Sequence, residues 1–224
     1  MKIRWLSALL LTMCIGGCAA EPFERPPLSM LNNPNPTAMR ESVAHSLADQ
    51  FTSDDTIVID APFHKMAILG VLQVDRPAGT FELVGLNPMG VELFHLSGDN
   101  SGTKIRSALP PLMEQQEVLL SIGQDIRRMY FDLVPQDAAA ADPRSTFVRF
   151  TEKSPDGTIV YEMGGEPTVL LEKRLEGCLG AVWRVRYYRY AAAKDNGLYP
   201  RGIVMDNAHY HYRIIVKNRD WQTN

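Results

Sequence analysis

Five short apolar runs follow one another between residues 56 and 109, and their spacing limits the possible folds more than any other feature. The turn sequences RPAG, NPMG and GDNSG separate most of them, and these contain the Gly, Pro, Asn and Asp that tight turns favour. The runs are rich in β-branched and aromatic residues: TIVID, MAILGVLQVD, TFELVGL, VELFHLSG and TKIRSAL. Short runs bounded by turns predict strands joined as successive antiparallel hairpins.

Several of these runs are apolar on both faces. In MAILGVLQVD, Leu69 and Val71 point to one side, whereas Ile68, Leu72 and Val74 point to the other. An antiparallel sheet with one solvated face would alternate apolar and polar residues instead. The pattern therefore favours a sheet that is covered by helices on its inner side, or one that encloses an apolar cavity.

Two segments have helical periodicity. Thr37 is a suitable N-cap for AMRESVAHSLADQF, in which Met39 and Val43 share one face. The second helix is expected within residues 112–134, weakened by roughly 1 kcal/mol at Gly123. Further strands follow in AVWRVRYYRY, GIVMDN and HYHYRIIVKN. The order predicts a mainly β fold of the α+β class, a curled antiparallel sheet capped by two helices, with residues 37–224 as one domain.

The N-terminus predicts a lipoprotein signal peptide over residues 1–17. Lys2 and Arg4 precede twelve uncharged residues, a hydrophobic stretch too short to span a bilayer. Cys18 follows Ile-Gly-Gly, which resembles the bacterial lipobox, so Cys18 is expected to be acylated and to anchor the mature chain. An ordinary secretory signal cut near Ala19 or Ala20 is the alternative. By analogy with enterobacterial sorting, alanine rather than aspartate at position 19 predicts the periplasmic face of the outer membrane.

Residues 18–36 carry five prolines and predict an acylated, flexible tether. Loss of residues 1–17 changes the formal net charge from −3 to −5, and a mildly acidic chain without a basic run is not expected to bind nucleic acid. Cys178 is then the one thiol besides the anchor, which excludes an internal disulfide and predicts a buried, inert cysteine.

No catalytic signature is present: the chain lacks GxSxG, HExxH, CxxC, P-loop and GxGxxG motifs. His209 and His211 would share one face of a strand, but no third ligand lies near them in the sequence, so exposed histidines are the simpler interpretation. The chain is therefore predicted not to be an enzyme and to need no cofactor beyond the lipid on Cys18.

The segments FELVGLNPMGVELFHLSGDN and VWRVRYYRY, together with a closing Trp221, resemble LolB, an outer-membrane lipoprotein that receives other lipoproteins from the periplasmic carrier LolA. The chain also resembles a family of uncharacterised bacterial lipoproteins, some of them associated with aryl polyene or other acyl-product clusters. The resemblance implies an unclosed antiparallel β-barrel with a helical lid and an acyl-binding interior. It also implies that Met89, with Pro88, forms a membrane-insertion loop; an ordinary turn with Met89 folded back on the sheet is the alternative.

The expected function is that of a monomeric acceptor that binds acyl chains of lipoproteins or lipids, receives them from a LolA-like carrier and inserts them into the outer membrane. A carrier of a cluster-specific acyl product and a structural or assembly lipoprotein with a filled interior are the alternatives. The choice of strand face is open because a one-residue slip reverses it. The residues expected to line the cavity are Leu69, Val71, Phe81, Leu83, Leu93, Trp183, Val185, Tyr212 and Ile214.

Overall fold

The computed structural model describes residues 21–62, 64–193 and 197–223. The predicted signal peptide and Cys18 lie outside the described residues. The strands are β1 (Gln50–Ala61), β2 (His64–Asp75), β3 (Thr80–Leu86), β4 (Glu92–Asp99), β5 (Gly102–Ala108), β6 (Ala140–Pro143), β7 (Phe147–Ser154), β8 (Gly157–Gly164), β9 (Val169–Gly177), β10 (Gly180–Ala192), β11 (Leu198–Asn207) and β12 (Tyr212–Thr223). The helices are α1 (Pro36–Ser46), α2 (Pro110–Met113) and α3 (Gln116–Tyr130).

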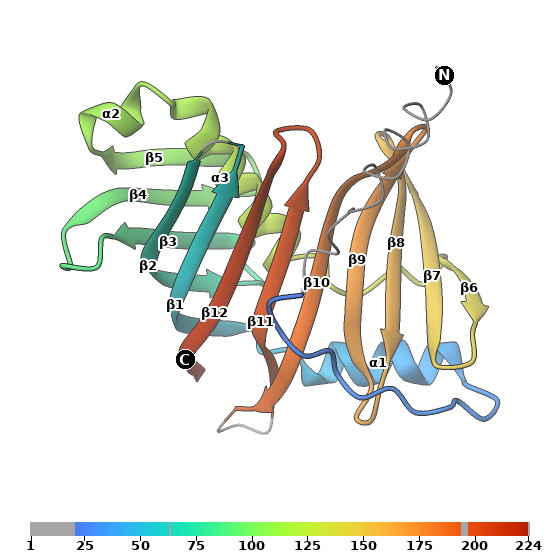
Figure 1. Cartoon of the computed structure of the whole chain (residues 1–224). Coiled ribbons are helices and arrows are strands. Elements are labelled where there is room, and N and C mark those ends of the chain that lie inside the picture. The colour runs from blue at the N-terminus through green and yellow to red at the C-terminus, as the bar shows by residue number, and fades with distance from the viewer. Residues whose placement is uncertain (1–20, 63, 194–196, 224) are drawn as a thin grey trace, which may run out of the picture.

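The twelve strands found in the described residues form one sheet in the order β5-β4-β3-β2-β1-β12-β11-β10-β9-β8-β7-β6 (Figure 1). Every neighbouring pair is antiparallel, and β5 and β6 remain as the two edges. The long pairing of β1 with β12 brings the two ends of the domain together at the centre of the sheet. The structure thus confirms the predicted fold class, a mainly β, unclosed antiparallel barrel with helices.

One face of this sheet forms the core. On β1 every second residue from Phe51 to Ile59 is buried, and the residues between them are half-buried. Ile57 lies opposite Val216, and Ile59 opposite Ile214, all four buried. The concave side of the curled sheet therefore carries a largely apolar surface, interrupted on β1 by Ser53 and Asp55, and it contains many of the β-branched and aromatic residues of the strand runs.

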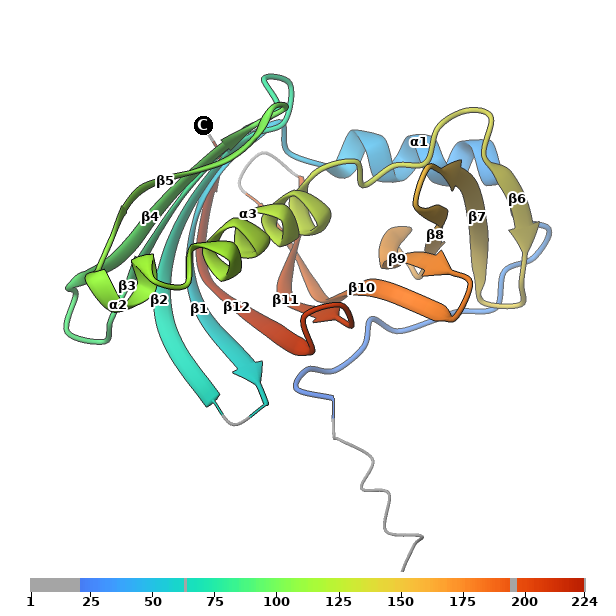
Figure 2. The same ribbon diagram turned by 90° about the horizontal axis from the view of Figure 1, so that it is seen from above.

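Two helices lie on the concave side of the sheet (Figure 2). α3 runs through the curve formed by β1–β5 and β12, and contacts β4, β5 and β11. α1 covers the other half of the sheet through contacts with β8 and β9, where it buries Met39 and Val43. Asn35, rather than Thr37, caps α1, and its side chain accepts a hydrogen bond from the amide of Ala38 at 3.2 Å.

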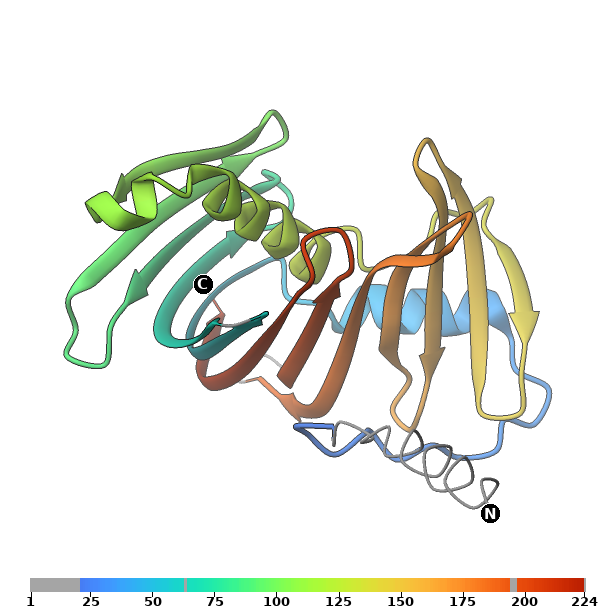
Figure 3. The ribbon, with the colours of Figure 1, turned by 45° about the horizontal axis from the view of Figure 1, so that its top comes forward.

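The segment predicted as a free tether lies against the domain from Glu21 onward (Figure 3). The Phe23 ring contacts that of Tyr188, with the ring centroids 5.7 Å apart, and it covers Gly202, where a side chain would collide with it. Farther along, the amide of Leu31 donates to the carbonyl of Ser145 at 2.8 Å. Residues 21–35, named here the N-terminal strap, contain no strand or helix, as their prolines predict, yet they are not free of the sheet.

None of the helices in the described part of the chain is both long enough and apolar enough to cross a bilayer.

Candidate functional site

The candidate site is the apolar interior between α3 and the concave side of the sheet. Apart from Asp55 on β1, its lining from the sheet is hydrophobic and comes from five neighbouring strands: Ile57 and Ile59, Ile68 and Leu72, Leu83, Phe94, and Ile214 and Val216. Ile122, Ile126 and Met129 of α3 close it. The enclosed space measures about 20 Å³, which is room for about one water molecule and not for an acyl chain. In this conformation, therefore, α3 fills the interior.

The C-terminal end of α3 is fixed by side chains from the sheet. The Tyr187 hydroxyl donates to the carbonyl of Met129 at 3.0 Å, and Arg76 Nε donates to that of Tyr130 at 2.9 Å. Lys173 Nζ donates to the carbonyl of Phe131 at 3.0 Å. These donors satisfy carbonyls that every helix end leaves without an intrahelical partner.

Lys173 shows how enclosed this end of the helix is. Its side chain is buried, and desolvation lowers the pKa of its ammonium group to about 8, despite the opposing effect of Asp132 and Glu152. The ammonium group also lies 5.7 Å from the ring centroid of Tyr161 and 5.8 Å from that of Trp183. Burial of a cation costs free energy unless the cation is hydrogen-bonded. The bond from Lys173 to the carbonyl of Phe131 therefore holds the C-terminal end of α3 in place.

A polar cluster interrupts the apolar contact between α3 and the sheet, and we name it the α3 latch: Ser121, Asp125, Asn207 and Tyr212. Asp125 is completely buried, accepts a hydrogen bond from the Tyr212 hydroxyl at 2.5 Å and another from Asn207 Nδ2 at 3.1 Å, and pairs with Arg128. The Ser121 hydroxyl lies 2.8 Å from that of Tyr212. The latch joins the middle of α3 to β11 and β12.

The two ends of α3 are held unequally. No side chain caps its N-terminus at Gln115, and residues 116–118 are exposed. The C-terminal half, in contrast, is mostly buried and is hydrogen-bonded to β9, to β10 and to the turn between β2 and β3. If α3 moves, the geometry favours a swing about its C-terminal end that breaks the latch and opens the interior.

A second buried carboxylate lies below the helix. Asp55 is almost fully buried, and it accepts hydrogen bonds from the Ser53 hydroxyl at 2.9 Å and from Asn218 Nδ2 at 3.1 Å. Burial raises its pKa to about 7 because these two neutral donors compensate only part of the desolvation of the charge. Asp55 is therefore expected to exchange its proton near neutral pH.

Residues 53–220 match the family model described as "Protein of unknown function (DUF3261)". The chain belongs to this family. The comparison with curated proteins finds no match.

The fold of this DUF3261 member is similar to that of a LolA superfamily protein from Nitrosomonas europaea, with a TM-score of 0.53 and 8% identity over 84% of this chain and 93% of the other. A putative outer membrane lipoprotein-sorting protein domain from Vibrio parahaemolyticus aligns with a TM-score of 0.47 and 9% identity, over 83% of this chain and 90% of the other. The likeness to the Nitrosomonas protein confirms the LolA/LolB-like fold that the sequence motifs predicted, and at this identity it concerns the fold alone.

Within the DUF3261 fold, the predicted cavity residues divide between the two faces of the sheet. Six of them are buried on the inner side, and Leu93 is half-buried against the same core; the six are Phe81, Leu83, Trp183, Val185, Tyr212 and Ile214. The assignment of Leu69 and Val71 was wrong. The register places Leu72 opposite Leu83, so the inner residues of β2 are Ile68, Leu72 and Val74, while Val71 is 37% exposed on the outer side.

The predicted insertion loop projects from the sheet. Met89 is 85% exposed, and Pro88 beside it is exposed as well, so Met89 is not folded back on the sheet. The side chain of Asn87 shapes the turn by accepting hydrogen bonds from the amides of Met89 and Val91, both at 2.9 Å. Gly90 completes it with a φ of 82°. An exposed methionine on a structured turn is compatible with membrane insertion, and that role stays a prediction.

The histidine pair does not have the expected geometry. His209 and His211 lie in the turn between β11 and β12, not in a strand, and His211 has a φ of 55°, so the period of two does not apply to them. Within the described ranges, no three His, Cys, Asp or Glu side chains are grouped to hold a metal ion. Cys178 is also unlike its prediction, because it is exposed in the hairpin between β9 and β10.

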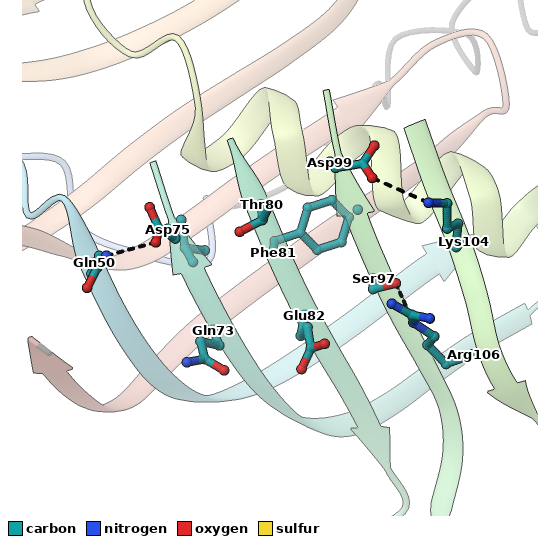
Figure 4. Close-up of a pocket in the computed structure, with 12 residues that line it drawn as sticks. Gln50, Gln73, Asp75, Thr80, Phe81, Glu82, Ser97, Asp99, Lys104 and Arg106 are labelled. Carbon is teal, nitrogen blue, oxygen red and sulfur yellow. Dashed lines mark hydrogen bonds and ion pairs between the residues drawn. The ribbon is translucent and has the colours of Figure 1, made fainter. Parts of the chain in front are cut away.

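A hollow of about 480 Å³ lies on the outer side of β2–β5, on the opposite face from α3 (Figure 4). Its walls are mostly polar, and several of their groups bind one another: Gln50 with Asp75, and Lys104 with Asp99. The hollow is open and carries mixed charges, in contrast to the apolar interior. We therefore place the candidate site beneath α3.

No local pattern in the sequence indicates the α3 latch. Asp125 in isolation is typical of the solvated side of a helix. The one available signal is its position between Ile122 and Ile126, which share the buried face of α3, because a carboxylate on that face needs a partner inside the fold.

Proposed function

We propose that this protein binds an acyl chain of a lipoprotein or lipid beneath α3 and delivers it to the outer membrane, to whose periplasmic face it is anchored through Cys18. The observation that carries the proposal is the apolar concave surface beneath a helix that is fixed at one end only. Burial of an acyl chain against such a surface is favourable by roughly 25 cal/mol per Å² of apolar area, so transfer between carriers and into a bilayer needs no catalyst.

The closed interior sets a requirement for this function. Binding pockets for small molecules usually measure about 300–1,000 Å³. The present space of about 20 Å³ accepts no ligand, so the side chains of α3 must leave before an acyl chain can enter. The free N-terminal end of α3 and the short helix α2 before it supply the movable part, and the latch supplies the contact that is broken.

A titration with a dansyl-labelled fatty acid tests the binding step, with two tryptophan variants on neighbouring positions of β2. Leu72→Trp adds volume to the interior and is expected to abolish saturable binding, whereas Val71→Trp adds still more volume, but on the outer side, and is expected to leave binding intact. Circular dichroism checks that both variants fold. Equal binding by the two variants would place the acyl chain elsewhere.

A transfer experiment tests delivery. Protein that carries Cys18→Ala and lacks residues 1–17 is mixed with LolA loaded with a tagged lipoprotein, and a pull-down shows whether the cargo changes hands. Met89→Asp is expected to spare this step and to block the later delivery to liposomes. Met30→Asp, at another exposed methionine in the N-terminal strap, is the control and is expected to block neither. No transfer from a LolA that does supply LolB would refute the acceptor function.

The filled interior also favours a second candidate, a structural or assembly lipoprotein that binds only protein. An interior of about 20 Å³ is what a permanently filled barrel requires. The two candidates differ in the fatty-acid titration, because a barrel whose interior stays filled gives no saturable binding in any variant.

A further inference from the structure

The exposed apolar side chains of the described residues are unevenly distributed. Four of the ten large ones lie at the tips of elements along one edge of the molecule: Met113 in α2, Val118 at the start of α3, Leu179 in the β9–β10 hairpin and Tyr210 in the β11–β12 hairpin. These elements lie together along the top of Figure 1, and the turned view of Figure 3 keeps them on one side. We name the edge formed by α2, the start of α3 and these two hairpins the upper edge.

The form of the upper edge fits a lipid surface better than a folded partner. A protein interface needs a contiguous, complementary patch, whereas these side chains stand on separate projecting tips. Leu179 is fully exposed at the tip of the β9–β10 hairpin, between the exposed Cys178 and Gly180. Apolar and aromatic residues that project from a scaffold can enter the interfacial layer of a bilayer without such complementarity.

The N-terminal strap gives an independent indication of direction. Glu21 pairs with Arg186 at 3.1 Å, and three residues later Glu24 pairs with Arg189 at 3.9 Å. Because β10 begins at Gly180 on the upper edge, Arg186 lies nearer to that edge than Arg189 does. From Glu21 to Glu24 the strap therefore runs away from the upper edge, and Glu21 is the end of the strap nearer to it.

The distances along the chain agree with this direction. Cys18 precedes Glu21 by three residues, which span at most about 11 Å when extended. Asp206, which pairs with Arg186, lies one residue before the end of β11 and four residues before Tyr210, which is at most about 13 Å of chain. An acyl group on Cys18 can therefore enter a membrane that touches the upper edge.

We propose that the upper edge is the membrane-contacting surface, with the β9–β10 and β11–β12 hairpins and α2 resting in the interfacial layer. The strap, fixed to the outer face of the sheet, then sets the orientation. This inference rests on the anchoring at Cys18 in the proposed function, but not on acyl binding or on Met89. It places the free end of α3 next to the bilayer.

The exposed thiol of Cys178, adjacent to Leu179, provides a probe of the edge itself. The mature lipidated protein is labelled there with a nitrobenzoxadiazole maleimide and incorporated in vesicles of phosphatidylethanolamine and phosphatidylglycerol that contain nitroxide-labelled lipid. The matched control is Cys178→Ser with Ala78→Cys, in the exposed β2–β3 turn at the other end of the strands.

We expect severalfold stronger quenching of the label at position 178 than at position 78, and Leu179→Asp combined with Met113→Asp should reduce it to the control level. Equal quenching at the two positions, stronger quenching at position 78, or failure of the protein to float with the vesicles would overturn the proposal. The transfer experiment in solution uses anchor-free protein, so it reports on the proposed function whatever the outcome here.

Discussion

Removal of one hydroxyl from the α3 latch should loosen the lid without disturbing the apolar core. In Tyr212→Phe the ring that packs in the interior remains, but the hydrogen bonds to Asp125 and Ser121 are lost. A hydrogen bond to a charged group contributes about 1.5–3 kcal/mol. Asp125 keeps Arg128 and Asn207 as partners, so we take about 2 kcal/mol as the cost to the closed state.

A loss of about 2 kcal/mol raises the ratio of open to closed molecules roughly 30-fold. When the closed form predominates, the apparent affinity for an acyl ligand should rise by a similar factor, because a larger fraction of the protein is competent to bind. Titration with the dansyl-labelled fatty acid measures this change, and hydrogen exchange measures the opening of α3 directly.

The control for this experiment is Tyr210→Phe. Tyr210 stacks on Tyr212 with the ring centroids 6.2 Å apart, but it is exposed and its hydroxyl takes no part in the latch. This variant should match the wild type in both assays. The latch does not govern a local opening if Tyr212→Phe leaves both the affinity for the fatty acid and the hydrogen-exchange rates of the α3 amides unchanged. The same conclusion follows if hydrogen exchange becomes faster to an equal extent in all strands.

Three further predictions concern stability. The raised pKa of Asp55 means that the folded state holds its proton more tightly than the unfolded chain does, so the free energy of unfolding should fall by up to about 4 kcal/mol as the pH rises from about 4 through about 7. Urea denaturation at several pH values should show this fall in the wild type and not in Asp55→Asn. Parallel curves for the two proteins would show that Asp55 is not its cause. Leu72→Ala should cost about 2–5 kcal/mol by chemical denaturation and Val71→Ala less than about 1 kcal/mol, since one is buried and the other exposed, whereas equal losses would refute the register. Gly98→Val should lower the melting temperature because its new side chain would collide with the Phe81 ring, and an unchanged temperature would show that the ring can move aside.

The sequence predicted the sheet, its hairpins and its two-faced apolar strands, because turn residues and strand propensity act locally. It could not predict which face of β2 lies inside, since Leu69 and Leu72 are equally apolar and a period of two has no preferred phase in such a run. That phase follows from the pairing of Leu72 with Leu83, a tertiary contact. The same limit explains why six cavity residues were assigned correctly to the inner face and two to the wrong one.

The latch shows a limit of another kind. Asp125 meets Asn207 and Tyr212 across separations of 82 and 87 residues, and no local pattern relates them. The strap was missed for a similar reason. Its prolines exclude regular structure correctly, but contact between Phe23 and Tyr188 depends on a surface formed by strands far along the chain.

The central claim is that the interior beneath α3 opens and takes an acyl chain. Photocrosslinking with a diazirine-bearing fatty acid, followed by mapping of the modified peptides, tests it most directly. We predict saturable labelling of the inner residues of β2 and β3, such as Leu72 and Leu83, and stronger labelling in Tyr212→Phe. Labelling confined to the outer face of the sheet, or none that an unlabelled fatty acid competes away, would contradict the account.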